Sequence, residues 1–249
     1  MEGSLKMKEN SVKTALVIGG CRGIGRAISL RLAKDGFAVT ATCRKKGEDS
    51  LSLEAEIAAD GGICNILELD VCCKNSARQT LSEAFPEAPD VLVYNSGIAK
   101  DNLFVFMDDA EWQSVIDTNL NGFYNTVQPM VFGMLAKRGG RIVVISSASG
   151  QTGQAGQVNY SASKAALIVA VKALAREVGR KGVLVNVVAP GVIETEMTKD
   201  LPRDQILPLI PLHRTGKADE ISGVVSFLCG PDSSYIHGQV IAVNGGLVI

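Results

Sequence analysis

The chain has 249 residues, of which 46% are hydrophobic and 20% charged, and its formal net charge at pH 7 is −1. This length and composition are typical of one folded domain with a substantial core. The near-neutral charge, without a basic block or stripe, argues against nucleic acid as the main partner. No apolar run is long enough to cross a bilayer, and the polar first ten residues lack the apolar segment of a signal peptide, so we expect a cytoplasmic protein.

The six cysteines include no C-x-x-C pair. Cys72 and Cys73 are adjacent, which is a poor geometry for a disulfide or a structural zinc site. Only His213 and His237 could supplement the cysteines as ligands, and both lie far along the chain. We therefore expect reduced, structural cysteines and no metal site.

The first predicted strand, 13–19, is followed at once by a glycine-rich turn and a helix over 26–35. In this context the backbone N–H groups of the turn can approach a pyrophosphate, and the helix amino end favours its charge. The pattern predicts a dinucleotide site at this junction. Residues 1–12 are polar and are expected to form a flexible segment. The turn consists of Gly19, Gly20, Cys21, Arg22, Gly23, Ile24 and Gly25.

A second strand, 37–42, ends in the basic run Arg44-Lys45-Lys46. An acidic residue at this place would bind the ribose hydroxyls of NAD, and none is present. Arg44 and Lys45, joined by Arg22 of the glycine turn, could instead pair with a 2′-phosphate, which favours NADP(H). The alternative is a solvated basic loop.

The third and fourth predicted strands, 62–71 and 90–94, end in further candidate cofactor contacts. Asp70 closes the third strand, where it either touches the adenine edge or caps the next helix. The fourth strand leads into a tight turn of small residues, Asn95-Ser96-Gly97, beside the expected cofactor.

Helical patterns at 50–59, 76–85, 109–136 and 219–228 alternate with the strands. This alternation predicts an α/β fold with one domain, a doubly wound parallel sheet of the Rossmann type. Asn119 stands in an apolar helical stretch, where a polar side chain needs a buried partner. On pattern alone it is either a functional group or a satisfied polar group of the helix.

The central part of the chain carries the candidate chemistry. An apolar strand over 141–147 ends in Ser147, and a helix over 159–178 carries Tyr160 and Lys164 on one face, because they are four residues apart. A Tyr–Lys pair of this spacing is commonly a surface pair. Ser147, thirteen residues before Tyr160, favours a site, because ligands of open α/β sheets bind at the carboxyl ends of the strands.

These three side chains are suited to proton transfer. A phenol has a pKa of about 10 and is a poor acid at neutral pH. A neighbouring Lys164 ammonium would lower the pKa of Tyr160, which could then protonate a carbonyl oxygen while hydride reaches the carbonyl carbon. Ser147 would hold that oxygen by a hydrogen bond that strengthens as negative charge develops.

A strand over 183–189 follows and ends in Pro190-Gly191, and a last strand is predicted at 239–243. Between them, the segment 194–213 contains three prolines and breaks the α/β rhythm. A long irregular segment after a strand end is a candidate substrate lid.

With these motifs in this order, the chain resembles the short-chain dehydrogenase/reductases over essentially residues 13–249. It is most similar to the 3-oxoacyl-[acyl-carrier-protein] reductases of fatty acid synthesis and their relatives in polyketide and aryl polyene pathways. The segments GRIVVISSASG, GQVNYSASKAAL and NVVAPGVIETEMT and the ending VNGG carry this narrower likeness. The resemblance implies an NADPH-dependent homotetramer that reduces a 3-oxoacyl thioester on the carrier protein to its 3-hydroxy form.

The resemblance also implies residue roles. Tyr160 would be the general acid, Lys164 would lower its pKa and bind the nicotinamide ribose, and Ser147 would orient the carbonyl. Asn119 would hold a water that links Lys164 to solvent. The implied cofactor contacts are with the pyrophosphate (Gly19, Arg22, Gly23, Ile24 and Gly25), the 2′-phosphate (Arg44), the adenine (Asp70 and Val71), the ribose (Asn95 and Gly97) and the carboxamide (Ile193 and Thr195). The expected cofactor site is completed by Cys21, Lys45, Ser96, Pro190 and Gly191.

Arg138 and Lys181 match basic positions thought to dock the acidic carrier protein, with ordinary surface charge as the alternative. Three residues depart from the family pattern. Ile18 stands where a Thr is usual, Tyr94 replaces the first Asn of Asn-Asn-Ala-Gly, and Ser96 replaces its Ala. These changes bear on the rigidity of the cofactor turn and leave the proton-transfer residues untouched.

Two other functions fit the same sequence. The first keeps the chemistry but acts on a free ketone, a sugar or a steroid, because nothing in the lid segment identifies the substrate. The second is an NADP(H)-sensing or scaffold protein without catalysis, which the fold alone does not exclude. The intact Ser147, Tyr160 and Lys164 argue against it, since a binding module has no need for all three.

Overall fold

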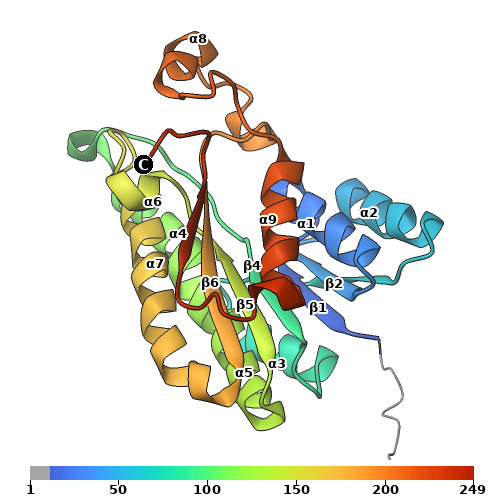
Figure 1. Cartoon of the computed structure of the whole chain (residues 1–249). Coiled ribbons are helices and arrows are strands. Elements are labelled where there is room, and N and C mark those ends of the chain that lie inside the picture. Colours follow the sequence, from blue (N-terminus) through green and yellow to red (C-terminus); the bar gives the residue numbers. More distant parts are fainter. Residues whose placement is uncertain (1–11) are drawn as a thin grey trace, which may run out of the picture.

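The computed structural model describes residues 12–249, so nearly all of the expected flexible segment 1–12 lies outside the described residues. Within them, seven strands form one parallel sheet in the order β3-β2-β1-β4-β5-β6-β7 (Figure 1). The order reverses between β1 and β4, which is the point where ligands of doubly wound sheets bind. The predicted fold class is confirmed. The strands are β1 (Thr14–Ile18), β2 (Ala38–Cys43), β3 (Cys64–Glu68), β4 (Val91–Tyr94), β5 (Gly140–Ile145), β6 (Val183–Pro190) and β7 (Val240–Val243).

Helices cover both faces of the sheet. One face is covered by α1 (Gly23–Lys34), α2 (Glu48–Ala59) and α9 (Ala218–Cys229), and the other by α3 (Lys74–Ala84), α5 (Gly122–Lys137) and α7 (Val158–Val178) (Figure 1). No helix within residues 12–249 is both long and apolar enough to cross a membrane. The shorter helical pieces are α4 (Asp109–Ile116), α6 (Ser149–Thr152), α8 (Arg203–Ile206) and the turns η1 (Phe104–Phe106), η2 (Asp117–Asn121), η3 (Gly179–Lys181), η4 (Glu196–Thr198), η5 (Leu207–Leu209) and η6 (Pro231–Ser233).

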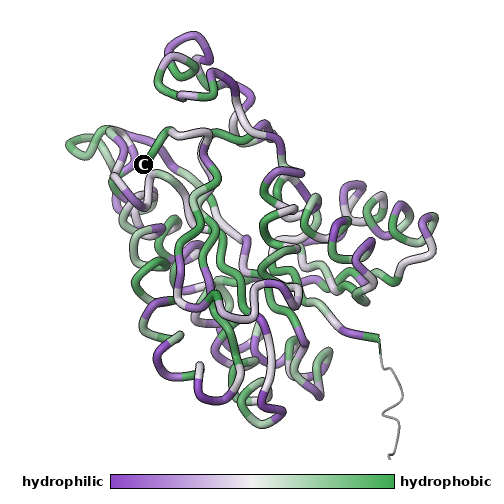
Figure 2. Tube along the Cα trace, in the orientation of Figure 1, coloured by the Kyte–Doolittle hydropathy of each residue, from purple (hydrophilic) through white to green (hydrophobic). Residues whose placement is uncertain are grey.

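The strands separate two hydrophobic layers. Along β1, Leu16 and Ile18 belong to the layer under α5 and α7, and Ala15 and Val17 to the layer under α1 and α9. Successive strand residues point to opposite faces, and both faces are covered, so the strands are continuous apolar runs. Figure 2 shows these hydrophobic strands at the centre, whereas hydrophilic residues are frequent on the surrounding helices and loops.

One predicted helix differs from the structure. The stretch 109–136 is divided by a π turn at Asp117–Asn121, between α4 and α5. A π turn inserts one extra residue into a helix and is frequent at functional sites. The helical pattern of apolar residues in the sequence continues through 117–121 without a break. The π turn is therefore not caused by the local pattern and depends on contacts with other elements. Asn119 lies inside it.

Candidate active site

The glycine turn between β1 and α1 leaves no room for a side chain at Gly19 or Gly25. Gly19 has a φ of +74°, and a Cβ on it would lie 2.7 Å from the Ser96 hydroxyl oxygen. A Cβ on Gly25 would lie 2.0 Å from the Gly19 carbonyl oxygen. That oxygen accepts a hydrogen bond of 2.9 Å from Asn95 Nδ2. The turn is therefore tied to the loop after β4, although Ile18 offers no hydroxyl for this purpose.

The start of α1 is suited to an anion. Its first turn contains no acidic residue, and no side chain caps its amino end. Arg22 at the N-cap is exposed, as are Arg44 and Lys45 after β2. Free N–H groups and the positive end of the helix dipole favour a pyrophosphate here. The close backbone approach in the turn fits a dinucleotide. Of the other turn residues, Cys21 is buried, Ile24 is half-buried and Gly23 is exposed.

Asp70 and Val71 follow β3 at the same edge of the sheet. Asp70 is half-buried, and its Oδ1 accepts a hydrogen bond of 2.9 Å from the Cys72 backbone N–H. This bond closes a local turn, and α3 begins later, at Lys74. Val71 is buried, and its carbonyl accepts a hydrogen bond of 2.8 Å from Asn125 Nδ2. The Leu69 N–H, just before them, donates to the Cys43 carbonyl of β2 at 2.8 Å, so this stretch lies beside the end of β2.

Ser147, Tyr160 and Lys164 come together at the carboxyl end of β5. Lys164 is buried, and its Nζ donates to the Ile145 carbonyl at 2.9 Å and lies 5.7 Å from the centre of the Tyr160 ring. The Ser147 side chain lies close enough to the Tyr160 phenol to lower its pKa in part. Its Oγ also accepts a hydrogen bond of 3.1 Å from the Ser149 backbone N–H. The predicted convergence of the three side chains is present in the structure, and their chemical roles remain predictions.

The end of β4 closes on the same space. A Cβ on Gly97 would lie 3.2 Å from Lys164 Nζ and 3.3 Å from Asn119 Oδ1. Asn119 is fully buried, its Oδ1 accepts from the Ile98 N–H at 2.8 Å, and its Nδ2 donates to the Ile98 carbonyl at 3.0 Å and to Ser163 Oγ at 2.9 Å. All these partners lie outside its own helix. Asn119 therefore joins the loop after β4 to α7.

The protonation of the two central groups follows from burial. Burial raises the pKa of Tyr160, and the neighbouring Ser147 side chain lowers it less than burial raises it. Burial also lowers the pKa of Lys164 to about 8. The sequence led us to expect that Lys164 lowers the pKa of Tyr160, and the direction in the structure is the opposite. The cause is the removal of the phenolate from water. Tyr160 consequently keeps its proton at neutral pH, as a proton donor must.

A short hydrogen-bonded chain adjoins these residues, and the sequence did not indicate it. Ser149 Oγ donates to Gln157 Oε1 at 3.0 Å, and Gln157 Nε2 donates to Asp101 Oδ2 at 2.7 Å. The Asp101 carboxylate contributes to the raised pKa of Tyr160, after burial. In the sequence, only the positions of these residues point to the site: Gln157 precedes Tyr160 by three residues, and Asp101 follows the turn after β4.

The residues after β6 reach the opposite side of the same space. Pro190 ends β6, and the Gly191 N–H donates to the Val243 carbonyl at 3.0 Å. Ile193 is buried, and Thr195 is half-buried. A Cβ on Gly23 would lie 3.6 Å from Thr195 Cγ2. The base of the lid segment therefore faces the glycine turn.

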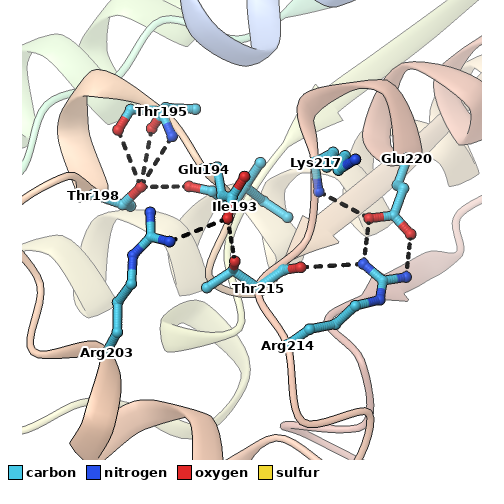
Figure 3. Close-up of polar contacts among 9 residues, drawn as sticks. All are labelled: Ile193, Glu194, Thr195, Thr198, Arg203, Arg214, Thr215, Lys217 and Glu220. Carbon is cyan, nitrogen blue, oxygen red and sulfur yellow. Dashed lines mark hydrogen bonds and ion pairs between the residues drawn. The ribbon is translucent and has the colours of Figure 1, made fainter.

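Side-chain contacts hold both ends of the lid segment 194–213 to neighbouring residues. Glu194 Oε1 accepts from Thr215 Oγ1 at 2.7 Å and from Arg203 Nη1 at 3.3 Å (Figure 3). On the far side, Arg214 and Glu220 form a double hydrogen bond of 2.8 and 2.6 Å that ties the end of the lid to α9 (Figure 3). These contacts hold the lid at its base and leave α8 projecting from the body (Figure 1).

The basic pair Arg138 and Lys181 lies elsewhere. A Cβ on Gly182 would lie 2.7 Å from the Arg138 carbonyl oxygen, so the turns that carry Arg138 and Lys181 are adjacent. They precede β5 and β6, however, whereas Ser147 follows β5. At about 3.3 Å per strand residue, β5 separates the pair from Ser147 by roughly 20 Å.

Comparison with known proteins places the chain in a well-populated group. The family described as Enoyl-(Acyl carrier protein) reductase matches residues 19–248. The 3-oxoacyl-[acyl-carrier-protein] reductase FabG of Aggregatibacter actinomycetemcomitans is 43% identical over 240 residues, 94% of this chain and 99% of the relative. The proteins of the same name from Pseudomonas aeruginosa and Staphylococcus epidermidis are 43% and 40% identical, again over 94% of this chain, and 97% and 98% of the relatives are covered.

Proposed function

The chain belongs to the short-chain dehydrogenase/reductase family, and we propose that it is an NADPH-dependent 3-oxoacyl-[acyl-carrier-protein] reductase. The convergence of Ser147, Tyr160 and Lys164 beside the glycine turn carries this proposal. Reduction of a carbonyl requires a proton donor next to the hydride donor, and Tyr160 is the buried, protonated group at this place. The names of the relatives supply the substrate class.

The cofactor would be held along the carboxyl edge of the sheet. The backbone of the glycine turn and the start of α1 would bind the pyrophosphate. Arg44, Lys45 and Arg22 are exposed near that edge and would pair with the 2′-phosphate. Asp70 and Val71 would flank the adenine, Asn95, Ser96 and Gly97 the ribose, and the segment from Pro190 to Thr195 the carboxamide.

The chain's own residues would manage the proton. NADPH, when bound, supplies the hydride. Ser147 would hold the carbonyl oxygen, and Tyr160 would deliver its proton to that oxygen as negative charge develops there. Lys164 would stabilise the resulting phenolate, since an opposite charge favours the ionised form. Asn119, beside Lys164, would position a water that returns a proton from solvent.

An acyl substrate is supported by the surface of the lid. Met197, Leu209 and Leu212 expose 59%, 65% and 63% of their surface there. A hydrocarbon chain would bury such side chains, whereas a sugar would not.

We place the enzyme in the cytoplasm, in the synthesis of fatty acids, polyketides or aryl polyenes, with residues 13–249 as one catalytic domain.

We also propose a homotetramer. Phe132 on α5, Val169 on α7 and Ile249 at the chain end expose 81%, 65% and 111% of their reference surface, as expected of contact surfaces between copies. Carrier-protein docking at Arg138 and Lys181 would take place at the amino ends of the strands. In an assembly, such a pair would serve the site of an adjacent copy.

The first test is the oxidation of NADPH or NADH, followed by absorbance, with a short 3-oxoacyl thioester. We expect turnover with a preference for NADPH, and no turnover with the 2-enoyl thioester of the same length, which has no ketone for Ser147 and Tyr160 to bind. Turnover of the enoyl substrate alone would contradict the proposal. A free ketone or a steroid as the better substrate would support the alternative carbonyl reductase, and NADPH binding without turnover would support a sensing role.

A further inference from the structure

Tyr94, the last residue of β4, is completely buried. Its hydroxyl donates a hydrogen bond of 2.6 Å to the Thr118 carbonyl. Its ring meets the Phe123 ring edge-on, with centroids 5.6 Å apart. Burial raises the pKa of Tyr94 well above its usual range, so the hydroxyl remains a donor. A buried phenol of this kind needs a defined acceptor, and here the acceptor belongs to the π turn.

The π turn and Tyr94 fit each other sterically. A Cβ on Gly122, the first residue after the turn, would lie 2.6 Å from Tyr94 Oη and 2.8 Å from Val71 Cγ2. The hydroxyl therefore reaches Thr118 only because residue 122 carries no side chain. A π turn departs from the regular helical hydrogen-bond ladder, and the hydroxyl gives one of its carbonyls a donor from outside the helix.

The residue after Thr118 leads directly into the active site. The Asn119 side chain donates to Ser163 Oγ at 2.9 Å, and the Ser163 hydroxyl donates to the Tyr160 carbonyl at 2.7 Å. Asn119 Oδ1 and Lys164 Nζ also face the same point beside Gly97. The conformation of the π turn is thereby coupled to the turn of α7 that carries the proposed acid.

We propose that Tyr94 is a positioning residue for proton transfer: its hydroxyl fixes the π turn and thereby sets Asn119 against Lys164 and Ser163. The proposal rests on the proposed function, because it assigns the coupling to carbonyl reduction. Tyr94 touches none of the reacting atoms. It acts through Thr118 and Asn119.

The test is Tyr94→Phe in the full chain, which removes one oxygen and keeps the ring packing. We expect kcat to fall about tenfold, equivalent to about 1.4 kcal/mol. The pH profile of kcat should also shift, because a displaced Asn119 changes the surroundings of Lys164, and such a profile reports the pKa values of the groups that transfer the proton. The Kd for NADPH is expected to stay within about twofold. Tyr124→Phe is the matched control, since the Tyr124 side chain on α5 is largely exposed, and this variant should behave as the wild type.

Hydrogen exchange of the NADPH-bound proteins provides a readout without turnover. In Tyr94→Phe we expect faster exchange in 117–123 and also in 159–164, through the Asn119–Ser163 contact. Faster exchange confined to 117–123, with an unchanged kcat–pH profile, would overturn the proposal and leave Tyr94 a purely structural residue. If the wild type reduces no 3-oxoacyl thioester, the proposed function fails, and the exchange in 159–164 then decides the positioning role by itself.

Discussion

The polar groups beneath the site and those at the base of the lid are held in opposite ways. Asn119, Ser163 and Lys164 are buried, and their side chains bond to one another or to backbone carbonyls and N–H groups. The Glu194–Arg203 pair of the lid has 43% and 53% of its side-chain surface exposed. Breaking a buried bond leaves a group without a partner, whereas an exposed ion pair contributes little and is screened by salt. The geometry of the proposed proton-transfer site is therefore fixed, and the proposed substrate lid can adjust.

The strongest test of this difference is Tyr160→Phe. The variant loses the proposed proton donor and keeps a ring of nearly the same shape, so we expect kcat to fall by about 10²–10⁴. Circular dichroism and NADPH binding should match the wild type. Retained turnover in a folded, NADPH-binding variant would contradict the assignment of Tyr160 as the acid.

The sequence was sufficient for part of this site. Ser147, Tyr160 and Lys164 were predictable because a buried strand end and an i, i+4 pair on the next helix depend on local pattern alone. The contact between Gln157 and Asp101 joins residues 56 positions apart, so it requires the folded topology.

Other features could not be predicted because they depend on burial or on contacts with other elements. The π turn around Asn119 is invisible in the periodicity, because Tyr94 and Gly122 support it from two different elements. The direction of the Tyr160 pKa shift was mispredicted for a related reason. The charge of Lys164 can be read from the sequence, but the extent to which the phenol is removed from water cannot.

A second test concerns the cost of the buried ammonium. The pKa of Lys164 is about 8 in the folded protein and 10.5 for a solvated lysine, as in the unfolded chain, so between these values the unfolded chain binds a proton that the folded chain lacks. The free energy of unfolding of the wild type, relative to Lys164→Met, should therefore rise from pH 8 to 10.5. The expected slope is at most about 1.4 kcal/mol per pH unit.

Denaturant unfolding of both proteins between pH 7 and 10.5 measures this difference. Both proteins are measured in a Tyr160→Phe background, because that phenol adjoins Lys164. The more distant buried thiols titrate in both proteins, so their contributions cancel in the comparison. Below pH 8 the difference should be constant. A flat difference over the whole range would show that the pKa of Lys164 is the same in the folded and unfolded states, as for a well solvated ammonium, and the contrast between the site and the lid would lose its main support.

The smallest effect is expected at the lid. Glu194→Gln keeps an oxygen that can accept from Thr215 and removes the charge that attracts Arg203. Because the pair is exposed, we expect KM for the thioester to rise by no more than about threefold with kcat unchanged. Salt should reduce the difference in KM between the variant and the wild type, since 0.5 M NaCl screens the wild-type pair as well.

Glu56→Gln is the matched control, because it breaks an exposed Glu–Arg pair between α1 and α2, away from the lid. A large fall in kcat for Glu194→Gln alone would mean that the lid orders the reacting groups, and the separation between a fixed site and an adjustable cover would then be wrong.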